Sequence, residues 1–148
     1  MKISSKTIFL ADDDADDCIL FEDALREVCK DTQLTTAADG IELMNILAET
    51  VPPPPDVIFL DLNMPRKNGF ECLSEIKRTP KYSNIPVVIF STSSQPETVN
   101  DVYGKGANYY VPKPGTFAQL KTAIKEILAI DFTQNNSQPA KDKFLLTF

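Results

Sequence analysis

The stretch Asp56-Val57-Ile58-Phe59-Leu60-Asp61-Leu62-Asn63-Met64-Pro65 places four consecutive apolar residues between a run of prolines and a turn. An apolar run of this length predicts a short strand that is buried on both faces. The strand would carry the carboxylate of Asp61 to its C-terminal end. A single acid in this position is weak evidence of function, because surface loops often begin in the same way. It gains meaning where other charged groups converge on it.

The composition limits the classes of protein to which the chain can belong. Its 148 residues suit one compact domain, with 43% hydrophobic and 24% charged residues. The net charge of −6 and the lack of a basic stripe argue against nucleic-acid binding. The absence of histidine removes Ser-His-Asp and Cys-His catalysis as well as histidine metal sites. The chemistry must therefore rest on carboxylates, hydroxyls and lysines.

The N-terminus and the hydropathy predict a cytoplasmic protein with no membrane association. No apolar run reaches membrane-spanning length, and residues 1–6 lack the apolar stretch of a signal peptide. The cysteines at positions 18, 29 and 72 show no CxxC spacing, so we expect free thiols, mostly buried as small apolar residues.

Predicted strands and predicted helices alternate five times along the chain. Strands are predicted at 7–11, 34–38, 57–60, 86–91 and 107–111, and helices at about 15–30, 41–51, 70–78, 96–104 and 117–128. We expect Asp14 and Asp39 to cap their helices, and capping boxes at 94–97 and 116–119 to open two others. The first helix should turn Leu20 and Phe21 inward. The alternation predicts an α/β fold with a doubly wound five-stranded parallel sheet.

The chain divides into a domain over residues 1–130 and a C-terminal tail over 131–148. The tail is polar at 133–138 and apolar at Phe144, Leu145, Leu146 and Phe148. Two alternatives are open: an unstructured end, or a segment that docks on this domain or on a second copy.

Polar residues follow four of the predicted strands, where the carboxyl ends of a parallel sheet place chemistry. They are Asp12 and Asp13, then Asp61, then Ser91 with Thr92, and Tyr110 leading to Lys113. Three carboxylates in one crevice need a cation, and oxygen ligands without histidine or thiolate favour Mg²⁺. A hydroxyl and an ammonium group facing the same point suit phosphoryl transfer, with an aspartate as nucleophile.

These residues resemble the receiver domain of two-component response regulators, the CheY-like or flavodoxin-like (βα)5 fold with strand order 2-1-3-4-5. The resemblance covers about residues 6–130. It is carried by Leu10-Ala11-Asp12-Asp13-Asp14, by 59–65 with Asn68-Gly69, by Ser91, and by Tyr110 with Lys113-Pro114. The acidic start of the first helix is most similar to stand-alone receivers that partner cyanobacterial phytochromes.

The resemblance implies a role for each matching residue. Asp61 would accept the phosphoryl group, and Mg²⁺ would be held by Asp13 and Asp61, by Asp12 mostly through water, and by the backbone carbonyl of Asn63. Lys113 would pair with Asp61 and then with the phosphoryl group, Ser91 would bond a phosphoryl oxygen, and Tyr110 would swing inward as the aromatic switch. The family usually has a cis peptide before the proline that matches Pro114.

The resemblance also implies partners. A histidine kinase or phosphotransfer protein would donate to Asp61, and an unknown downstream protein would contact the changed face formed by the fourth helix, fifth strand and fifth helix. A homodimer through that face is a further expectation. The chain would be a signalling phospho-acceptor that catalyses its own phosphorylation and dephosphorylation rather than an enzyme on another substrate. With no output domain in the sequence, the signal would pass on by contact.

Two rival functions and three departures from the family pattern qualify this interpretation. An aspartate-nucleophile phosphatase would have a second aspartate where Asn63 stands and a Gly-Thr after it, and both are missing. A degenerate receiver used only for binding would have lost part of the acidic and lysine set. Ser91 replaces the commoner threonine, Thr92 stands where a smaller residue is frequent, and Pro112 requires its strand to be an edge.

Overall fold

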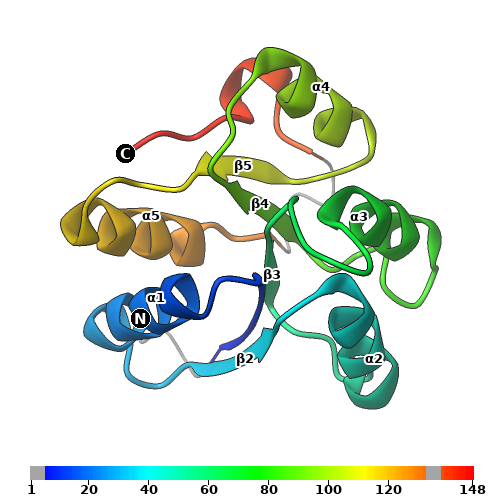
Figure 1. The fold of residues 1–148 in the computed structure, drawn as a ribbon, viewed down its shortest axis with the longest axis horizontal. Coiled ribbons are helices and arrows are strands. Elements are labelled where there is room, and N and C mark those ends of the chain that lie inside the picture. Colours follow the sequence, from blue (N-terminus) through cyan, green and yellow to red (C-terminus); the bar gives the residue numbers. More distant parts are fainter. Residues whose placement is uncertain (1–5, 133–137) are drawn as a thin grey trace.

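The computed structural model describes residues 6–132 and 138–148. Five strands alternate with five helices, followed by one short 3-10 helix (Figure 1). The strands are β1 (Thr7–Ala11), β2 (Gln33–Ala37), β3 (Val57–Leu60), β4 (Val87–Ser91) and β5 (Tyr109–Pro112). The helices are α1 (Ala15–Val28), α2 (Gly40–Thr50), α3 (Gly69–Arg78), α4 (Pro96–Gly104), α5 (Phe117–Ala129) and η1 (Lys141–Lys143).

The strands form one parallel sheet in the order β2-β1-β3-β4-β5, as predicted. Successive side chains of a strand point to opposite faces, so the central strand feeds two cores. Ile58 and Leu60 pack with the helices α2, α3 and α4, whereas Val57 and Phe59 pack with α1 and α5. All four are buried, which confirms the prediction of a strand covered on both faces. Figure 1 shows the two helical layers on either side of the sheet.

Side-chain caps fix the beginnings of most helices. Asp14 accepts from the backbone N–H of Asp16 at 2.9 Å, and Asp39 caps α2 in the same way, so both predicted caps are confirmed. Thr116 accepts from the backbone of Gln119 and caps α5. The predicted box at 94–97 is wrong: α4 has Gln95 at its N-cap position with no side-chain cap bond. Pro96 begins that helix instead, since its fixed φ suits the first turn and its missing N–H is not needed there.

Three further expectations differ from the structure. Leu20 was assigned to the buried stripe of α1, but it is 48% exposed, because the inward arc of the helix is filled by Phe21, Ala24 and Leu25. The fifth strand begins two positions later than the apolar run suggests, since the Ala107 N–H still donates to the Val102 carbonyl of α4 and Asn108 makes the first contact with β4. Among the described residues, the cis peptides precede Pro52 and Pro53 and not Pro114.

The segment from residue 138 to the C-terminus lies against α4 and the outer edge of β5 (Figure 1). The Tyr110 N–H donates to the Phe144 carbonyl at 3.1 Å, and the Leu146 N–H donates to the Tyr110 carbonyl at 2.8 Å. The Phe144 ring is fully buried between Tyr103 and Tyr110. The edge position expected of the strand containing Pro112 is confirmed, and the terminal segment pairs with its outer side. Residues 133–137 of the predicted polar tail lie outside the described residues.

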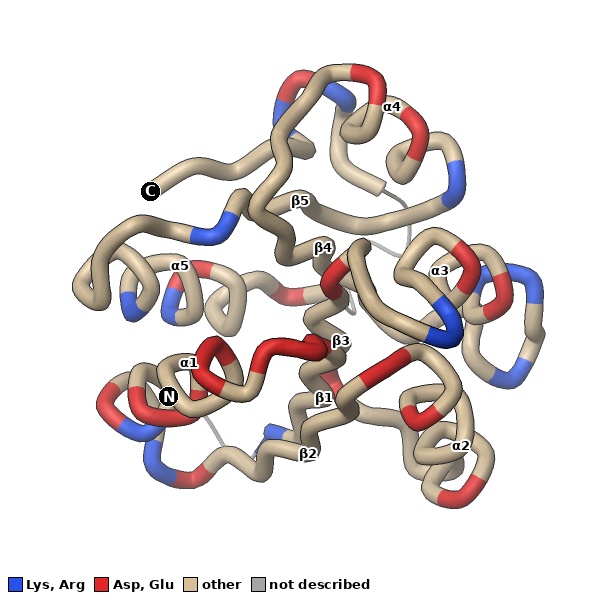
Figure 2. The backbone as a smooth tube through the Cα atoms, viewed as in Figure 1, with Lys and Arg blue, Asp and Glu red and all other residues tan. Residues whose placement is uncertain are grey.

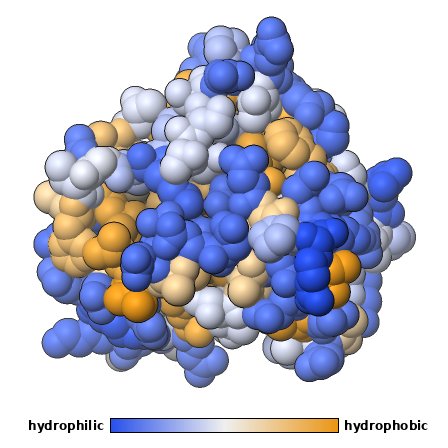
Figure 3. Space-filling model, viewed as in Figure 1, coloured by the Kyte–Doolittle hydropathy of each residue, from blue (hydrophilic) through white to orange (hydrophobic). Residues whose placement is uncertain are grey.

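The face toward the viewer is hydrophilic across its centre, and apolar side chains gather at the left over α1 and α5 (Figure 3). Ile19, at 57% exposed, and Leu20 belong to α1. Within 6–132 and 138–148, no helix combines the length and the apolar character that crossing a membrane requires. The three cysteines are free, as expected, but only Cys72 is buried, whereas Cys18 and Cys29 are partly exposed on and after α1.

Candidate functional site

The carboxyl ends of β1 and β3 place two acidic residues next to each other. Asp61 follows β3, and its backbone N–H donates to the Ala11 carbonyl at 2.9 Å. Asp12 follows β1, and its N–H donates to the Ala37 carbonyl at 3.0 Å. These bonds continue the sheet ladder by one residue, so the backbone at both acids is fixed by the sheet. Figure 2 shows the acidic residues (red) gathered where β1 passes into α1 and near the end of β3.

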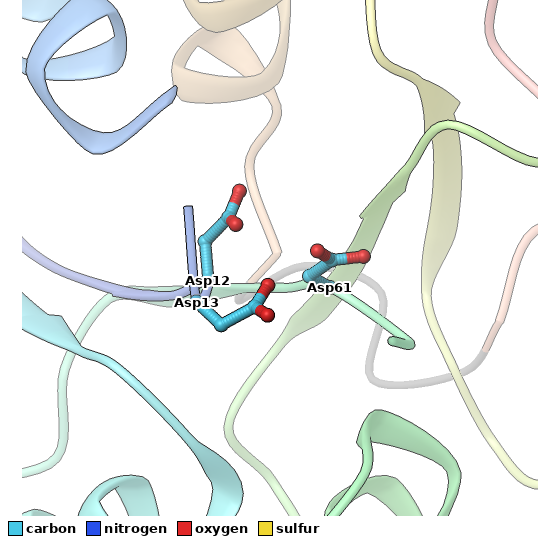
Figure 4. A group of neighbouring side chains, drawn as sticks. All are labelled: Asp12, Asp13 and Asp61. Carbon is cyan, nitrogen blue, oxygen red and sulfur yellow. The ribbon is translucent and has the colours of Figure 1, made fainter. Parts of the chain in front are cut away.

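Asp12, Asp13 and Asp61 form one acidic cluster. Each offers a carboxylate oxygen, and these oxygens all lie within 4.8 Å of one another (Figure 4). Asp12 and Asp61 are buried, at 2% and 5% exposed, whereas Asp13 is exposed. The convergence expected from the strand order is therefore present.

The cluster fits a hard divalent cation. Its donors are carboxylate oxygens, the ligands that Mg²⁺ and Mn²⁺ accept, and one of the three acids faces solvent, from which an ion can enter. The Asp12 Oδ2 atom is buried, and the Lys113 ammonium group forms an ion pair with it at 2.8 Å. The Asp12 Oδ1 atom accepts from the Asp14 N–H at 3.0 Å, which fixes the orientation of the carboxylate.

Lys113 brings a positive charge to the cluster from the loop after β5. Its Nζ atom lies 2.8 Å from Asp12 Oδ2 and 3.4 Å from Asp61 Oδ2. Burial acts to lower the pKa of Lys113, but the hydrogen bonds and charges of the surrounding carboxylates outweigh it and raise this pKa above its usual range. Lys113 is therefore a permanent cation that offsets part of the acidic charge.

Burial disfavours the charged form of Asp61. Burial raises the pKa of its carboxyl group; Lys113 opposes this shift and the negative charge of Asp12 adds to it. A bound cation would remove the penalty, because it stabilises the charged form of all three acids. The loop that follows contributes a weak hydrogen bond, from the Asn63 N–H to Asp61 Oδ1 at 3.4 Å.

Ser91 and Tyr110 lie on the two strands beyond β3. Ser91 ends β4 and is fully buried, and its backbone carbonyl accepts from the Lys113 N–H at 2.8 Å. Tyr110 in β5 is also buried, and its hydroxyl donates to the Ser93 carbonyl at 2.5 Å. The Ser93 N–H in turn reaches Ser91 Oγ at 3.5 Å. Tyr110 is thus connected to the loop after β4, and its predicted part as a switch remains a prediction.

A tight turn after Asp61 brings Gly69, the first residue of α3, into contact with the backbone of Asp61. A Cβ atom on Gly69 would lie 2.2 Å from the Asp61 carbonyl oxygen, so any other residue would push the two segments apart. Arg66 adopts a left-handed conformation at φ 64° and pairs with Asp39 at 3.0 Å. The Gly40 N–H donates to the Lys67 carbonyl. The loop is therefore held against the start of α2.

Asp17 is a member of the site that the sequence did not identify as one. Its Oδ2 atom lies 2.8 Å from Lys113 Nζ, closer than Asp61. From the sequence, Asp17 was explained by the positive end of the first helix. The sequence does place Asp17 at the third position of the predicted first helix, and the N-terminus of that helix adjoins the strand ends where Lys113 was also expected.

A family model for the response regulator receiver domain matches residues 8–125. The chain belongs to the response regulator receiver domain family. Its members are signalling phospho-acceptors rather than classical enzymes, which agrees with the interpretation of the strand ends. Response regulator Rcp1 of Synechocystis sp. is 33% identical over 126 residues, which are 82% of this chain and 86% of that protein.

The solved structures that are similar to this chain include those of two response regulators. The phosphorylated cyanobacterial phytochrome response regulator RcpA has a TM-score of 0.77 at 36% identity, covering 84% of this chain and 91% of that one. The Mn²⁺-bound form of response regulator Rcp1 has a TM-score of 0.75 at 32% identity, covering 91% and 99%. The resemblance to phytochrome-partner receivers, stated from the sequence, is confirmed by these matches.

Proposed function

We propose that the chain is a response regulator that accepts a phosphoryl group on Asp61 from a phosphohistidine donor, in a reaction that depends on Mg²⁺. The observation that carries the proposal is the placement of Asp61. Its carboxylate lies at the end of the central strand, beside Asp12 and Asp13 and 3.4 Å from a lysine ammonium group. The relatives support it, since one was solved in a phosphorylated form and another with Mn²⁺.

Asp12, Asp13 and Asp61 would hold the metal ion through carboxylate oxygens, with Asp12 acting mostly through water and Asn63 through its backbone carbonyl. The ion, when bound, neutralises charge on the acids and on the phosphoryl oxygens. The family uses Mg²⁺, and the all-oxygen donor set suits it. Lys113 supplies a second positive charge beside Asp61, so the site is arranged for an incoming group rich in negative oxygens.

The transfer forms one bond and breaks one. An oxygen of Asp61 attacks phosphorus while the P–N bond of the donor breaks, and the electron pair stays on the imidazole nitrogen, which takes up a proton. With acetyl phosphate as donor, the P–O bond breaks and acetate leaves. Asp61 acts as a nucleophile in its charged form, and its backbone bond to Ala11 holds it at the end of the strand.

The new dianion would then change the contacts of three residues. Lys113 moves to the phosphoryl group, the Ser91 hydroxyl donates to a phosphoryl oxygen, and Tyr110 exchanges its bond to Ser93 for a position behind Ser91. The surface formed by α4, β5 and α5 changes with them, as a pre-existing equilibrium shifts. A downstream protein, or a second copy in a homodimer, would contact that surface together with residues 138–148, which cover part of α4 and the outer edge of β5.

The partners follow from this chemistry. A histidine kinase or a phosphotransfer protein provides the phosphoryl group, and the protein acts in the cytoplasm, where such donors operate. The net charge of −6 provides no surface for nucleic acid. The phosphorylated protein would pass on its signal through a protein–protein contact.

The test is intact-protein mass after incubation with acetyl phosphate, with and without Mg²⁺. We expect a gain of one phosphoryl group that requires Mg²⁺ and is absent in Asp61→Asn. Asp16→Asn is the matched control, because Asp16 is exposed on the first turn of α1. Label that persists in Asp61→Asn would show that another residue is the acceptor. No label in the native protein after a fast quench would favour a receiver used only for binding.

A further inference from the structure

The Lys113 ammonium group is shared among three carboxylates, and Asp61 is the most distant of them. Its Nζ atom lies 2.8 Å from Asp12, 2.8 Å from Asp17 and 3.4 Å from Asp61. Two of these acids follow strands of the sheet, whereas Asp17 projects from α1. The ammonium group is therefore held on the α1 side of the site.

The contact between Asp17 and Lys113 is partly shielded from water. The Lys113 side chain is only 12% exposed and that of Asp17 is 35% exposed. The two residues line a small crevice of about 60 Å³ together with Leu20, Phe90, Pro114 and Leu120. These four apolar neighbours keep water from part of the pair, and the ammonium lies 5.9 Å from the centre of the Phe90 ring. An ion pair in such surroundings is screened less than one on an open surface.

The position of α1 gives Asp17 this reach. Asp14 caps the helix and also bonds the Asp17 N–H at 3.2 Å, which orients the first turn toward the site. Asp16 occupies the same turn and benefits equally from the positive helix end, but it is exposed and forms no ion pair within the described chain. The positive helix end therefore accounts for the presence of an acid at both positions, and the contact with Lys113 distinguishes Asp17 from Asp16.

We propose that Asp17 is a positioning residue that holds the Lys113 ammonium group away from Asp61 until a phosphoryl group draws it across. This inference rests on the proposed function of Asp61. With Lys113 held by Asp12 and Asp17, the Asp61 oxygens stay available to the metal ion and to the incoming phosphorus. Once Asp61 is phosphorylated, Asp17 competes with the phosphoryl group for the same cation and so shortens the lifetime of the phosphorylated state.

Asp17→Asn tests the proposal, since it keeps the shape of the side chain and removes its charge. In the variant, Lys113 settles closer to the Asp61 carboxylate and competes with the cation for its oxygens, so the affinity for Mg²⁺ falls. The phosphorylated state, freed of a competitor for Lys113, lives longer. We expect the Mg²⁺ affinity to fall about fivefold and the lifetime of the phosphorylated state to rise about fivefold. Each change corresponds to ~1 kcal/mol, at about 1.4 kcal/mol per tenfold.

Three further variants separate this role from a general effect of charge. Asp16→Asn makes the same change of charge in the same turn and should alter both quantities less than twofold. Asp17→Glu restores the charge and should recover most of the native behaviour. In a Lys113→Met background, Asp17→Asn should no longer change the Mg²⁺ affinity, because the cation through which it acts is gone.

The measurements are Mg²⁺ titration calorimetry, decay of the phosphoryl label by intact mass, and the ¹⁵N NMR signal of Lys113 Nζ, which should shift in Asp17→Asn and not in Asp16→Asn. Equal behaviour of Asp17→Asn and Asp16→Asn would overturn the inference, as would an undiminished effect without Lys113. A native protein that takes no label would overturn the proposed function instead. The Mg²⁺ and NMR measurements would then still decide the role of Asp17.

Discussion

Phe144 is the residue through which the terminal segment should contribute most to stability. Its ring is fully buried, with centroids 4.9 Å from Tyr103 and 6.3 Å from Tyr110 in edge-on geometry. Replacement of a buried phenylalanine by alanine in a rigid core lowers the free energy of unfolding by ~3–5 kcal/mol. The segment lies at the end of the chain and can detach as a whole, so its docking free energy sets the upper limit. We therefore expect Phe144→Ala to lower the free energy of unfolding by ~3 kcal/mol.

The assay is urea unfolding followed by circular dichroism, combined with hydrogen exchange at the amides of Tyr110 and Leu146, which donate across the contact. The unfolding midpoint should fall and both amides should lose protection. Leu145→Ala is the matched control: its side chain is 40% exposed in the same segment, and we expect a change of less than ~0.5 kcal/mol. Equal stabilities of the two variants, with both amides still protected, would refute the argument that Phe144 anchors the segment.

Two further predictions concern pH. Without a bound cation, burial raises the pKa of Asp61, so the folded state binds this proton more tightly than the unfolded state. The free energy of unfolding should therefore increase as pH falls from that raised pKa toward the ordinary value of 3.8. Asp61→Asn should lose this contribution in acid titrations of stability, whereas Asp16→Asn should keep it. Burial lowers the pKa of Lys77 to about 8, although its ammonium group donates to the Ile85 carbonyl at 2.9 Å. The unfolded state then binds more protons between pH 8 and 10.5, so stability should rise with pH there, and urea midpoints of Lys77→Met should lack the rise that Lys81→Met retains.

The fold could be predicted almost completely, because most strands are short apolar runs bracketed by turn or capping residues, and the polar edge strand β2 lies between two clear helices. Val57–Leu60 is the clearest case, with every side chain buried. The acidic cluster followed from the rule that parallel strands end at one edge of a sheet. Asp12, Asp13 and Asp61 are separated by up to 49 positions in sequence, yet strand order alone brings them together.

The features that the sequence could not predict depend on contacts between elements rather than on local pattern. The exposure of Leu20 depends on how α1 is rotated about its axis against the sheet, and hydrophobic periodicity alone does not fix that rotation. The contact of Asp17 with Lys113 joins residues 96 positions apart, from a helix and a loop. The start of α4 shows that a sequence with the residues of a capping box can place another residue at the cap.

The central claim is that Asp61 forms a bond to phosphorus, and the most direct measurement locates that bond. The protein is incubated with acetyl phosphate and Mg²⁺, reduced with borohydride, digested and analysed by peptide mass spectrometry, since borohydride converts an aspartyl phosphate to homoserine. The account predicts homoserine at position 61 and unchanged aspartate at positions 12, 13 and 17. Homoserine at any of those three positions, or its absence from a protein that has gained the phosphoryl mass, would contradict it.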